Sequence, residues 1–248
     1  MARNGPFPCS QRGQPTDVET TNGTRVSTLF RELARARGAR AFHPRGRWFA
    51  GELTTLSPGA LPLPEGTRPV TVRMSKGAGV PGAGADVLGL AVRVPAGDGR
   101  GGPWDLALSA SGIGWLTRMV PLPARGWGRA RYGSIVPYRS GGRLVWLLAV
   151  CAGDDPIAPA SLETLCRRVA ERPPLLVLHE GTAWDGWRPV ARLVLTARTR
   201  GPDPRPCFDP MRNRPAEVEM APRGFAALRE RAYHGSRLGR WSVDSPSE

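Results

Sequence analysis

The sequence predicts a mainly β domain with a few flanking helices, and a barrel is the arrangement that it favours. Two observations lead to this prediction. Runs rich in Val and Leu recur through the middle of the chain, and several of them alternate apolar residues with arginine or other polar residues. The 31 glycines and 26 prolines among the 248 residues fall mostly between these runs as turns, which excludes a collagen-like or fully disordered chain.

The predicted strands share that composition and those boundaries; they cover 69–75, 87–95, 104–110, 143–153, 174–181 and 187–198. A helix is predicted over 161–173, because Ser161 suits the N-cap position and Pro173 follows as a stop. A second helix is predicted over 223–240, and Val26 begins another apolar run at helical spacing. We therefore expect an α+β domain with an antiparallel sheet at its core.

The chain divides into one domain and two flanking segments. Residues 1–24 are polar and rich in Gly, Thr and Pro, which predicts a flexible N-terminal arm. Residues 25–240 are expected to form a single domain, long enough to bury roughly 70% of its unfolded surface without a disulfide or a metal. Residues 241–248 are predicted to form a disordered tail.

The charge balance is strongly basic, with 35 Lys and Arg against 21 Asp and Glu and a formal net charge of +14. Lys76 is the only lysine. Such a chain can bind nucleic acid, anionic lipid or an anionic small ligand, and arginine suits carboxylates and phosphates in confined sites. The simpler interpretation is a GC-rich coding sequence that uses Arg in place of Lys.

Cysteine placement and hydropathy bear on the cellular compartment. The four cysteines form no CxxC pair, which excludes a zinc ribbon or a thioredoxin-type site. The N-terminus lacks the apolar stretch of a secretory signal, and the longest uncharged apolar run, 144–152, is too short to cross a bilayer. We expect a cytoplasmic protein with reduced thiols and no membrane association.

Two short segments do not decide a function by themselves. Residues 77–82 match GxGxxG, but a predicted strand follows in place of the helix that a dinucleotide site requires, so the segment is interpreted as a turn. His43 lies in a segment dense in arginine, which fits either a solvated basic helix or an anion site beside a catalytic imidazole. The sequence contains no HExxH, GxSxG or GxxxxGK[ST] motif.

Arg229 and Tyr233 are four residues apart on the last predicted helix, so their side chains share a face. A guanidinium beside a phenol favours the phenolate, and a phenolate is a good ligand for ferric haem iron. Ordinary surface neighbours have the same spacing. The pair alone therefore leaves open both a ligand and a solvated face.

Five segments, in this order, resemble the haem catalase family: AFHPRGRWFAGELT, RPVTVRMSKGAG, ADVLGLAVRVP, GPWDLALSASG and CFDPMRNRP. The resemblance covers roughly residues 26–240 and is to a short, catalase-like form, a mini-catalase or catalase-related peroxidase. It implies an antiparallel catalase-like β-barrel, haem b as the cofactor, and a C-terminal helix that carries the proximal tyrosine.

The resemblance also assigns roles on the distal side of the haem. His43 would be the acid/base residue over the haem, and Ser75 would hydrogen-bond its ring and fix the tautomer. Ser109 falls where the family has its distal asparagine, so the amide donor of that residue is absent.

On the proximal side, the resemblance makes Tyr233 the axial iron ligand and Arg229 the residue that keeps it ionised. Arg40, Arg73 and Arg240 fall where the family places the arginines that pair with the haem propionates. These pairs give the two arginine clusters a purpose.

The activity implied is reduction of organic hydroperoxides, with H2O2 as a further candidate substrate and an unidentified electron donor as partner. The chain is shorter than full-length family members, which implies a more open pocket that admits larger hydroperoxides. One alternative is a hydroperoxide-rearranging haem enzyme of the allene oxide synthase type. The competing non-enzymatic class is a basic nucleic-acid-binding domain, and a homodimer is one assembly that stays open.

Overall fold

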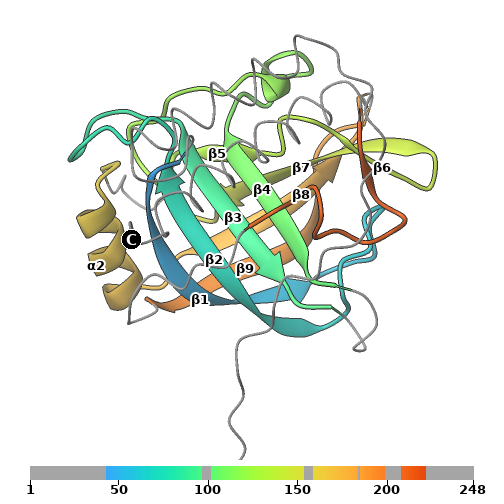
Figure 1. The fold of residues 1–248 in the computed structure, drawn as a ribbon, viewed down its shortest axis with the longest axis horizontal. Helices are drawn as coiled ribbons and strands as arrows, with labels where there is room; N and C mark the ends of the chain where they lie inside the picture. Colours follow the sequence, from blue (N-terminus) through green and yellow to red (C-terminus); the bar gives the residue numbers. More distant parts are fainter. Residues whose placement is uncertain (1–42, 97–101, 154–158, 184, 199–207, 222–248) are drawn as a thin grey trace, which may run out of the picture.

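The computed structural model describes residues 43–96, 102–153, 159–183, 185–198 and 208–221 (Figure 1). The predicted N-terminal arm, the helix predicted from Val26, the helix predicted over 223–240 and the predicted tail all lie outside the described residues. The prediction of a C-terminal helix carrying the proximal tyrosine therefore stays a prediction. No helix in the described part is long and apolar enough to span a bilayer.

The described residues form an antiparallel β-barrel whose strands are joined in the order β7-β5-β4-β3-β2-β1-β9-β8, with β8 pairing back to β7 (Figure 1). The barrel strands are β1 (Arg45–Thr55), β2 (Thr67–Lys76), β3 (Leu88–Val94), β4 (Trp104–Ala110), β5 (Arg131–Gly133), β7 (Arg143–Cys151), β8 (Leu175–Gly181) and β9 (Arg188–Arg198). The pairing of β7 with β8 closes the ring, so the barrel itself has no free sheet edge. Two short strands, β6 (Tyr138–Ser140) and β10 (Glu219–Met220), extend the sheet beyond β7.

All six predicted strands are confirmed, as β2, β3, β4, β7, β8 and β9. The strand pattern alone does not predict β1, because Gly46 and Gly51 interrupt it and arginine occupies Arg45 and Arg47. The short strands β5, β6 and β10 are two or three residues long, which is too short for any periodicity to appear.

Alternate residues of the barrel strands point inward and form one apolar core. Phe49 of β1, Val72 of β2, Leu90 of β3 and Leu106 of β4 are buried almost completely, and together with their counterparts on β7 to β9 they fill the interior. Burying side chains of this size contributes about 1.5–3 kcal/mol each. The inward alternation also fixes which residues of β1 to β4 face outward.

The predicted helix over 161–173 is confirmed as α2 (Leu162–Glu171), which lies beside the end of the barrel where β1 begins (Figure 1). Its N-cap is Ser161, whose hydroxyl accepts a hydrogen bond from the backbone N–H of Thr164 at 3.2 Å. Leu162, Leu165 and Val169 form its buried face, which packs against β9 and β1. The helix ends two residues before Pro173.

The interpretation of 77–82 as a turn is confirmed, because the chain runs from β2 into β3 without a helix. The buried carboxylate of Asp86 holds this connection in place: its oxygens accept hydrogen bonds from the backbone N–H groups of Ala78 and Val80, both at 2.8 Å. The segment offers no helix N-terminus to a phosphate.

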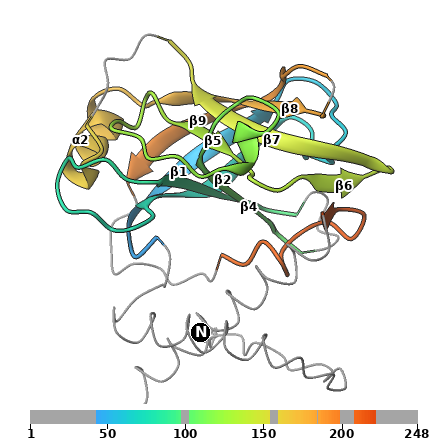
Figure 2. The ribbon, with the colours of Figure 1, turned by 90° about the horizontal axis from the view of Figure 1, so that it is seen from above.

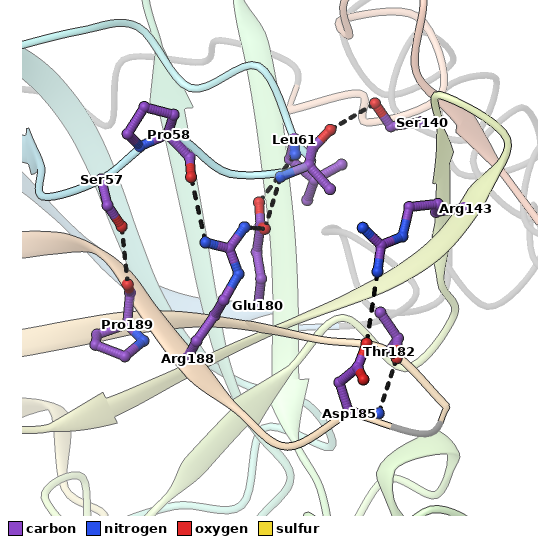
Figure 3. A network of polar contacts seen from close by, with 11 residues as sticks. Ser57, Pro58, Leu61, Ser140, Arg143, Glu180, Thr182, Asp185, Arg188 and Pro189 are labelled. Carbon is purple, nitrogen blue, oxygen red and sulfur yellow. Dashed lines mark hydrogen bonds and ion pairs between the residues drawn. The ribbon is translucent and has the colours of Figure 1, made fainter.

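A second buried carboxylate fixes the connection between β1 and β2 (Figure 3). Glu180 of β8 accepts hydrogen bonds from the backbone N–H groups of Ala60 and Leu61, both at 2.9 Å, and pairs with Arg188 of β9 at 3.0 Å. Nearby, Arg143 and Asp185 form an exposed ion pair at 3.5 Å. The buried network ties the loop to the barrel wall, whereas the exposed pair contributes little.

Candidate functional site

The outward-facing residues of β1 to β5 include a row of very small side chains. The strand register places Gly46 opposite Ser75, Ser75 opposite Gly89, Gly89 opposite Ser109, and Ser109 opposite Gly133. Because cross-strand partners point to the same side of a sheet, this row lies on the outside of the barrel. We call these five residues the small-residue row.

The imidazole of His43 lies over this row. Its Nδ1 is 3.0 Å from the hydroxyl oxygen of Ser75, its backbone N–H donates to the carbonyl of Gly77 at 3.0 Å, and its own carbonyl accepts from the Arg73 guanidinium at 2.9 Å. Both backbone polar groups and one ring nitrogen are thus held by residues at the C-terminal end of β2. The solvated basic helix considered for this segment is therefore wrong for His43.

The backbone of His43 is strained, with a φ of 55°. A non-glycine residue in this left-handed region costs of order 1 kcal/mol, and such residues persist where the surroundings hold them. Here the two backbone hydrogen bonds of His43 provide that restraint. Strain of this kind concentrates at functional positions, and it directs the ring toward the outer face of β2 and β3.

Gly89 makes room for the imidazole. A Cβ atom at this position would lie 2.5 Å from Cε1 of His43, 2.6 Å from its Nδ1 and 2.8 Å from the Ser75 hydroxyl oxygen. These distances are far inside van der Waals contact. Any residue larger than glycine would therefore displace either the ring or its hydrogen-bond partner.

Ser109 lies on the same face, one strand beyond Gly89. Two strand spacings separate it from Ser75, which places the two Cα atoms about 10 Å apart. Its side chain is half-buried, and its hydroxyl makes no hydrogen bond to the described part of the chain. Ser109 can thus contact a group that lies flat on the small-residue row.

Arg73 is almost fully buried on the same face of β2. Its guanidinium crosses over Gly46, where an added Cβ would lie 2.7 Å from Nη2, and its carbon Cζ is 5.9 Å from the centre of the Trp48 ring. The glycine and the indole thus shape a path along which the cation reaches the His43 carbonyl. The guanidinium therefore lies at this end of the small-residue row.

The other end of this face is closed by a polar cluster that the sequence analysis does not predict. Asp105 is fully buried and forms a bidentate pair with Arg93, with both N–O distances at 2.7 Å. The same carboxylate accepts hydrogen bonds from the Asp209 backbone N–H at 2.8 Å and the Asn213 amide at 2.7 Å. A buried carboxylate is stable only with such a set of donors.

This cluster attaches the 208–214 segment to the outside of the barrel, where it runs along β4 (Figure 2). Phe208 stacks against Trp48 with ring centres 5.2 Å apart and lies 5.0 Å from the Arg93 guanidinium. The pairing of Arg93 with Asp105 across β3 and β4 was detectable in principle, since opposite charges at matching positions of adjacent strands favour pairing.

Four of the proposed site residues, Arg40, Arg229, Tyr233 and Arg240, lie outside the described residues. Of the described tyrosines, Tyr132 and Tyr138 are fully buried in the core, so neither phenol faces the small-residue row. Across the described ranges no three His, Cys, Asp or Glu side chains gather in a way that could hold a metal ion.

No protein-family model and no curated protein sequence matches the chain. Solved structures do match it over nearly all of its length. A fungal catalase has 14% identity and a TM-score of 0.61, with 97% of this chain and 68% of that chain covered.

A bacterial catalase has 15% identity and a TM-score of 0.60 over 94% of this chain and 63% of that chain. Catalase A from Saccharomyces cerevisiae has 12% identity and a TM-score of 0.56 over 96% and 68%. The chain thus spans 63–68% of the length of these catalases. At such identities the likeness shows the fold, which is a catalase-like antiparallel β-barrel.

Proposed function

We propose that this chain is a haem-dependent peroxidase of the catalase-like fold that reduces organic hydroperoxides. The single observation that supports this most is the placement of His43 over the small-residue row, with its Nδ1 held at 3.0 Å from the Ser75 hydroxyl. A histidine in a strained backbone conformation, fixed over a row of glycine and serine residues, is suited to proton transfer on a ligand bound there.

The residues of this face fit a haem. A planar macrocycle needs a flat wall, and the small-residue row of Gly and Ser on β1 to β5 offers one beside His43. The buried cation of Arg73 suits a propionate carboxylate. Arg40, Arg73 and Arg240 would hold the propionates, and Tyr233, supported by Arg229, would bind the iron.

Haem b would supply the redox chemistry, which is the two-electron reduction of the peroxide bond with electrons from an external donor. The balanced reaction is ROOH + 2e− + 2H+ → ROH + H2O. The work of the protein is to position the substrate and to move protons. Of these, the described residues provide the proton relay.

His43 performs the relay through its second ring nitrogen. With Nδ1 engaged by Ser75, Nε2 is the atom that takes the proton of the hydroperoxide O–H group and returns it to the oxygen that departs as the alcohol. Transfer by a positioned base and acid of this kind contributes about 10²–10⁴ to a rate. Ser75 acts as a positioning residue, because it fixes which ring nitrogen carries the proton.

Ser109 favours organic hydroperoxides over H2O2. A serine hydroxyl is shorter than the asparagine amide of the family pattern, so it leaves more space over the small-residue row and supplies a weaker hold on a small peroxide. A bulky alkyl group can use that space. We therefore propose a peroxidase in preference to an efficient catalase.

The test is steady-state reduction of cumene hydroperoxide by the haem-supplied protein with a chromogenic electron donor. His43→Gln should lower kcat/KM at least 100-fold. The matched control is His179→Gln, since His179 is a half-buried strand residue whose Nδ1 lies 3.2 Å from the Val177 carbonyl, on the other half of the barrel. Equal activity of the wild type and His43→Gln would overturn the proposal.

A further inference from the structure

A pocket of about 410 Å³ lies between the start of β1, the connection from β2 to β3, and the first turn of α2. Arg45, Arg47, Arg73 and Lys76 line it, and Glu163 is the acidic residue at its wall. A volume of this size is within the range of small-molecule sites. Apart from Arg73, none of these cations has a role in the proposed haem site.

The fold itself brings the cations together. The register of β1 and β2 places Arg45 opposite Lys76, and Arg47 two residues along lies on the same face. The pairing of β1 with β9 begins only at Phe49, so the first part of β1 is unpaired on that side within the described strands. Side chains from this part of β1 can therefore surround a ligand at the barrel end.

Lys76 is nearly fully buried, and within the described residues its ammonium has an incomplete set of hydrogen-bond partners. Its Nζ donates to the carbonyls of Gly82 at 2.9 Å and Gly84 at 3.1 Å, which uses two of its three N–H groups. Burial lowers the pKa of Lys76, while the Asp86 carboxylate opposes that shift. A buried cation with one unused donor in a pocket wall favours an anionic occupant.

The arginines carry a similar excess of positive charge. Arg45 is exposed and makes no hydrogen bond or ion pair to the described residues. Among those residues the Arg47 guanidinium donates only to the Gly46 carbonyl, at 3.1 Å. The Glu163 carboxylate accepts from the Ser161 hydroxyl at 2.8 Å and forms no ion pair within 4.0 Å to any described cation. The pocket therefore holds like charges together with little compensation.

We propose that this pocket binds a small phosphate-bearing anion, either a phosphate ester or a pyrophosphate group. Even without Arg73, the cations Arg45, Arg47 and Lys76 against Glu163 leave an excess of two positive charges, which a single carboxylate ligand would not balance. A phosphate group carries up to two charges and offers several acceptor oxygens to the planar forks of Arg45 and Arg47. The pocket borders the small-residue row at Gly46, but Arg45, Arg47 and Lys76 have no role in the proposed haem site.

The test is calorimetric titration of the full-length protein with inorganic pyrophosphate at low salt, with and without supplied haem. The wild type should bind one equivalent in both forms. Arg45→Gln combined with Arg47→Gln should weaken binding at least tenfold. Arg45→Gln alone changes an exposed residue, so it keeps the test valid if the double variant fails to fold, and it should weaken binding several-fold.

The matched control is Arg139→Gln combined with Arg192→Gln, which removes the same charge from exposed positions on β6 and β9 outside the pocket. This control should bind pyrophosphate as the wild type does. No binding to the wild type, or equal weakening in both double variants, would overturn the proposal. Equal affinity for citrate would overturn the assignment to phosphate. None of these results depends on the haem spectrum, so they are separable from a failure of the proposed peroxidase function.

Discussion

The hydroxyl oxygen of Ser75 lies 3.0 Å from Nδ1 of His43, although 32 residues separate the two in the chain. The contact exists because β2 ends beside the segment that leads into β1, and because Gly89 leaves space for the ring between β2 and β3. The backbone N–H of the same histidine donates to the Gly77 carbonyl, and its backbone carbonyl accepts from the Arg73 guanidinium. His43 is therefore positioned by one strand end.

Replacing Ser75 tests whether it positions the ring. Ser75→Ala should lower kcat/KM for cumene hydroperoxide about tenfold, because the imidazole then populates both tautomers. The acid limb of the pH profile of kcat/KM should also shift to a different pH, which loss of packing alone would not produce. An unchanged pH profile would show that the hydroxyl has no part in the proton relay.

Gly89→Ala should disrupt the site sterically. The added methyl group would lie 2.5 Å from Cε1 of His43, so the ring must move and kcat/KM should fall at least tenfold. Gly186→Ala is the control, since an added Cβ there meets no atom within 4 Å and its backbone is not left-handed. Its activity should stay within about twofold of the wild type. Full activity in Gly89→Ala would contradict the placement of the imidazole.

The buried Asp105 carboxylate should be a major source of stability. Asp105→Ala leaves Arg93 and the donors of Asp209 and Asn213 without their acceptor, so the free energy of unfolding should fall by about 3–5 kcal/mol. Asp185→Ala breaks an ion pair in which both side chains are about two-thirds exposed, and should cost less than about 1 kcal/mol. Urea unfolding of both variants measures the contrast.

Tyr132 should make the protein less stable at alkaline pH. Burial raises the pKa of this phenol well above its usual value, so the folded protein keeps a proton that the unfolded chain loses near pH 10. The contribution is complete below that pH and declines by up to about 1.4 kcal/mol per pH unit above it. In urea unfolding above pH 10, Tyr132→Phe should show a shallower decline than the wild type. Parallel declines would contradict this assignment.

Much of the barrel could be predicted from the sequence because its inner residues are apolar at every second position. Phe49 and Val72 are examples of residues whose inward direction follows from strand periodicity. The boundaries of β1 could not be predicted in this way, because Gly46 and Arg47 stand near its start and interrupt the apolar alternation there. The start of the strand is also unpaired on its β9 side within the described strands.

The site was predictable in part, and only through a family resemblance. The resemblance relates His43 to Ser75, and the structure brings these two side chains into contact. No local pattern predicted that Phe208 would stack on Trp48, because the contact joins segments 160 residues apart. The burial of Lys76 was equally hidden, since a lone lysine at a strand end ordinarily faces solvent.

The measurement that tests the central claim most directly is the absorption spectrum of the protein expressed with a haem precursor, beside Tyr233→Phe and Tyr132→Phe. We expect a ferric Soret band of tyrosinate-ligated haem that is lost or shifted in Tyr233→Phe and retained in Tyr132→Phe, whose ring is buried in the core. A well-folded, haem-supplied protein without a Soret band would contradict the account.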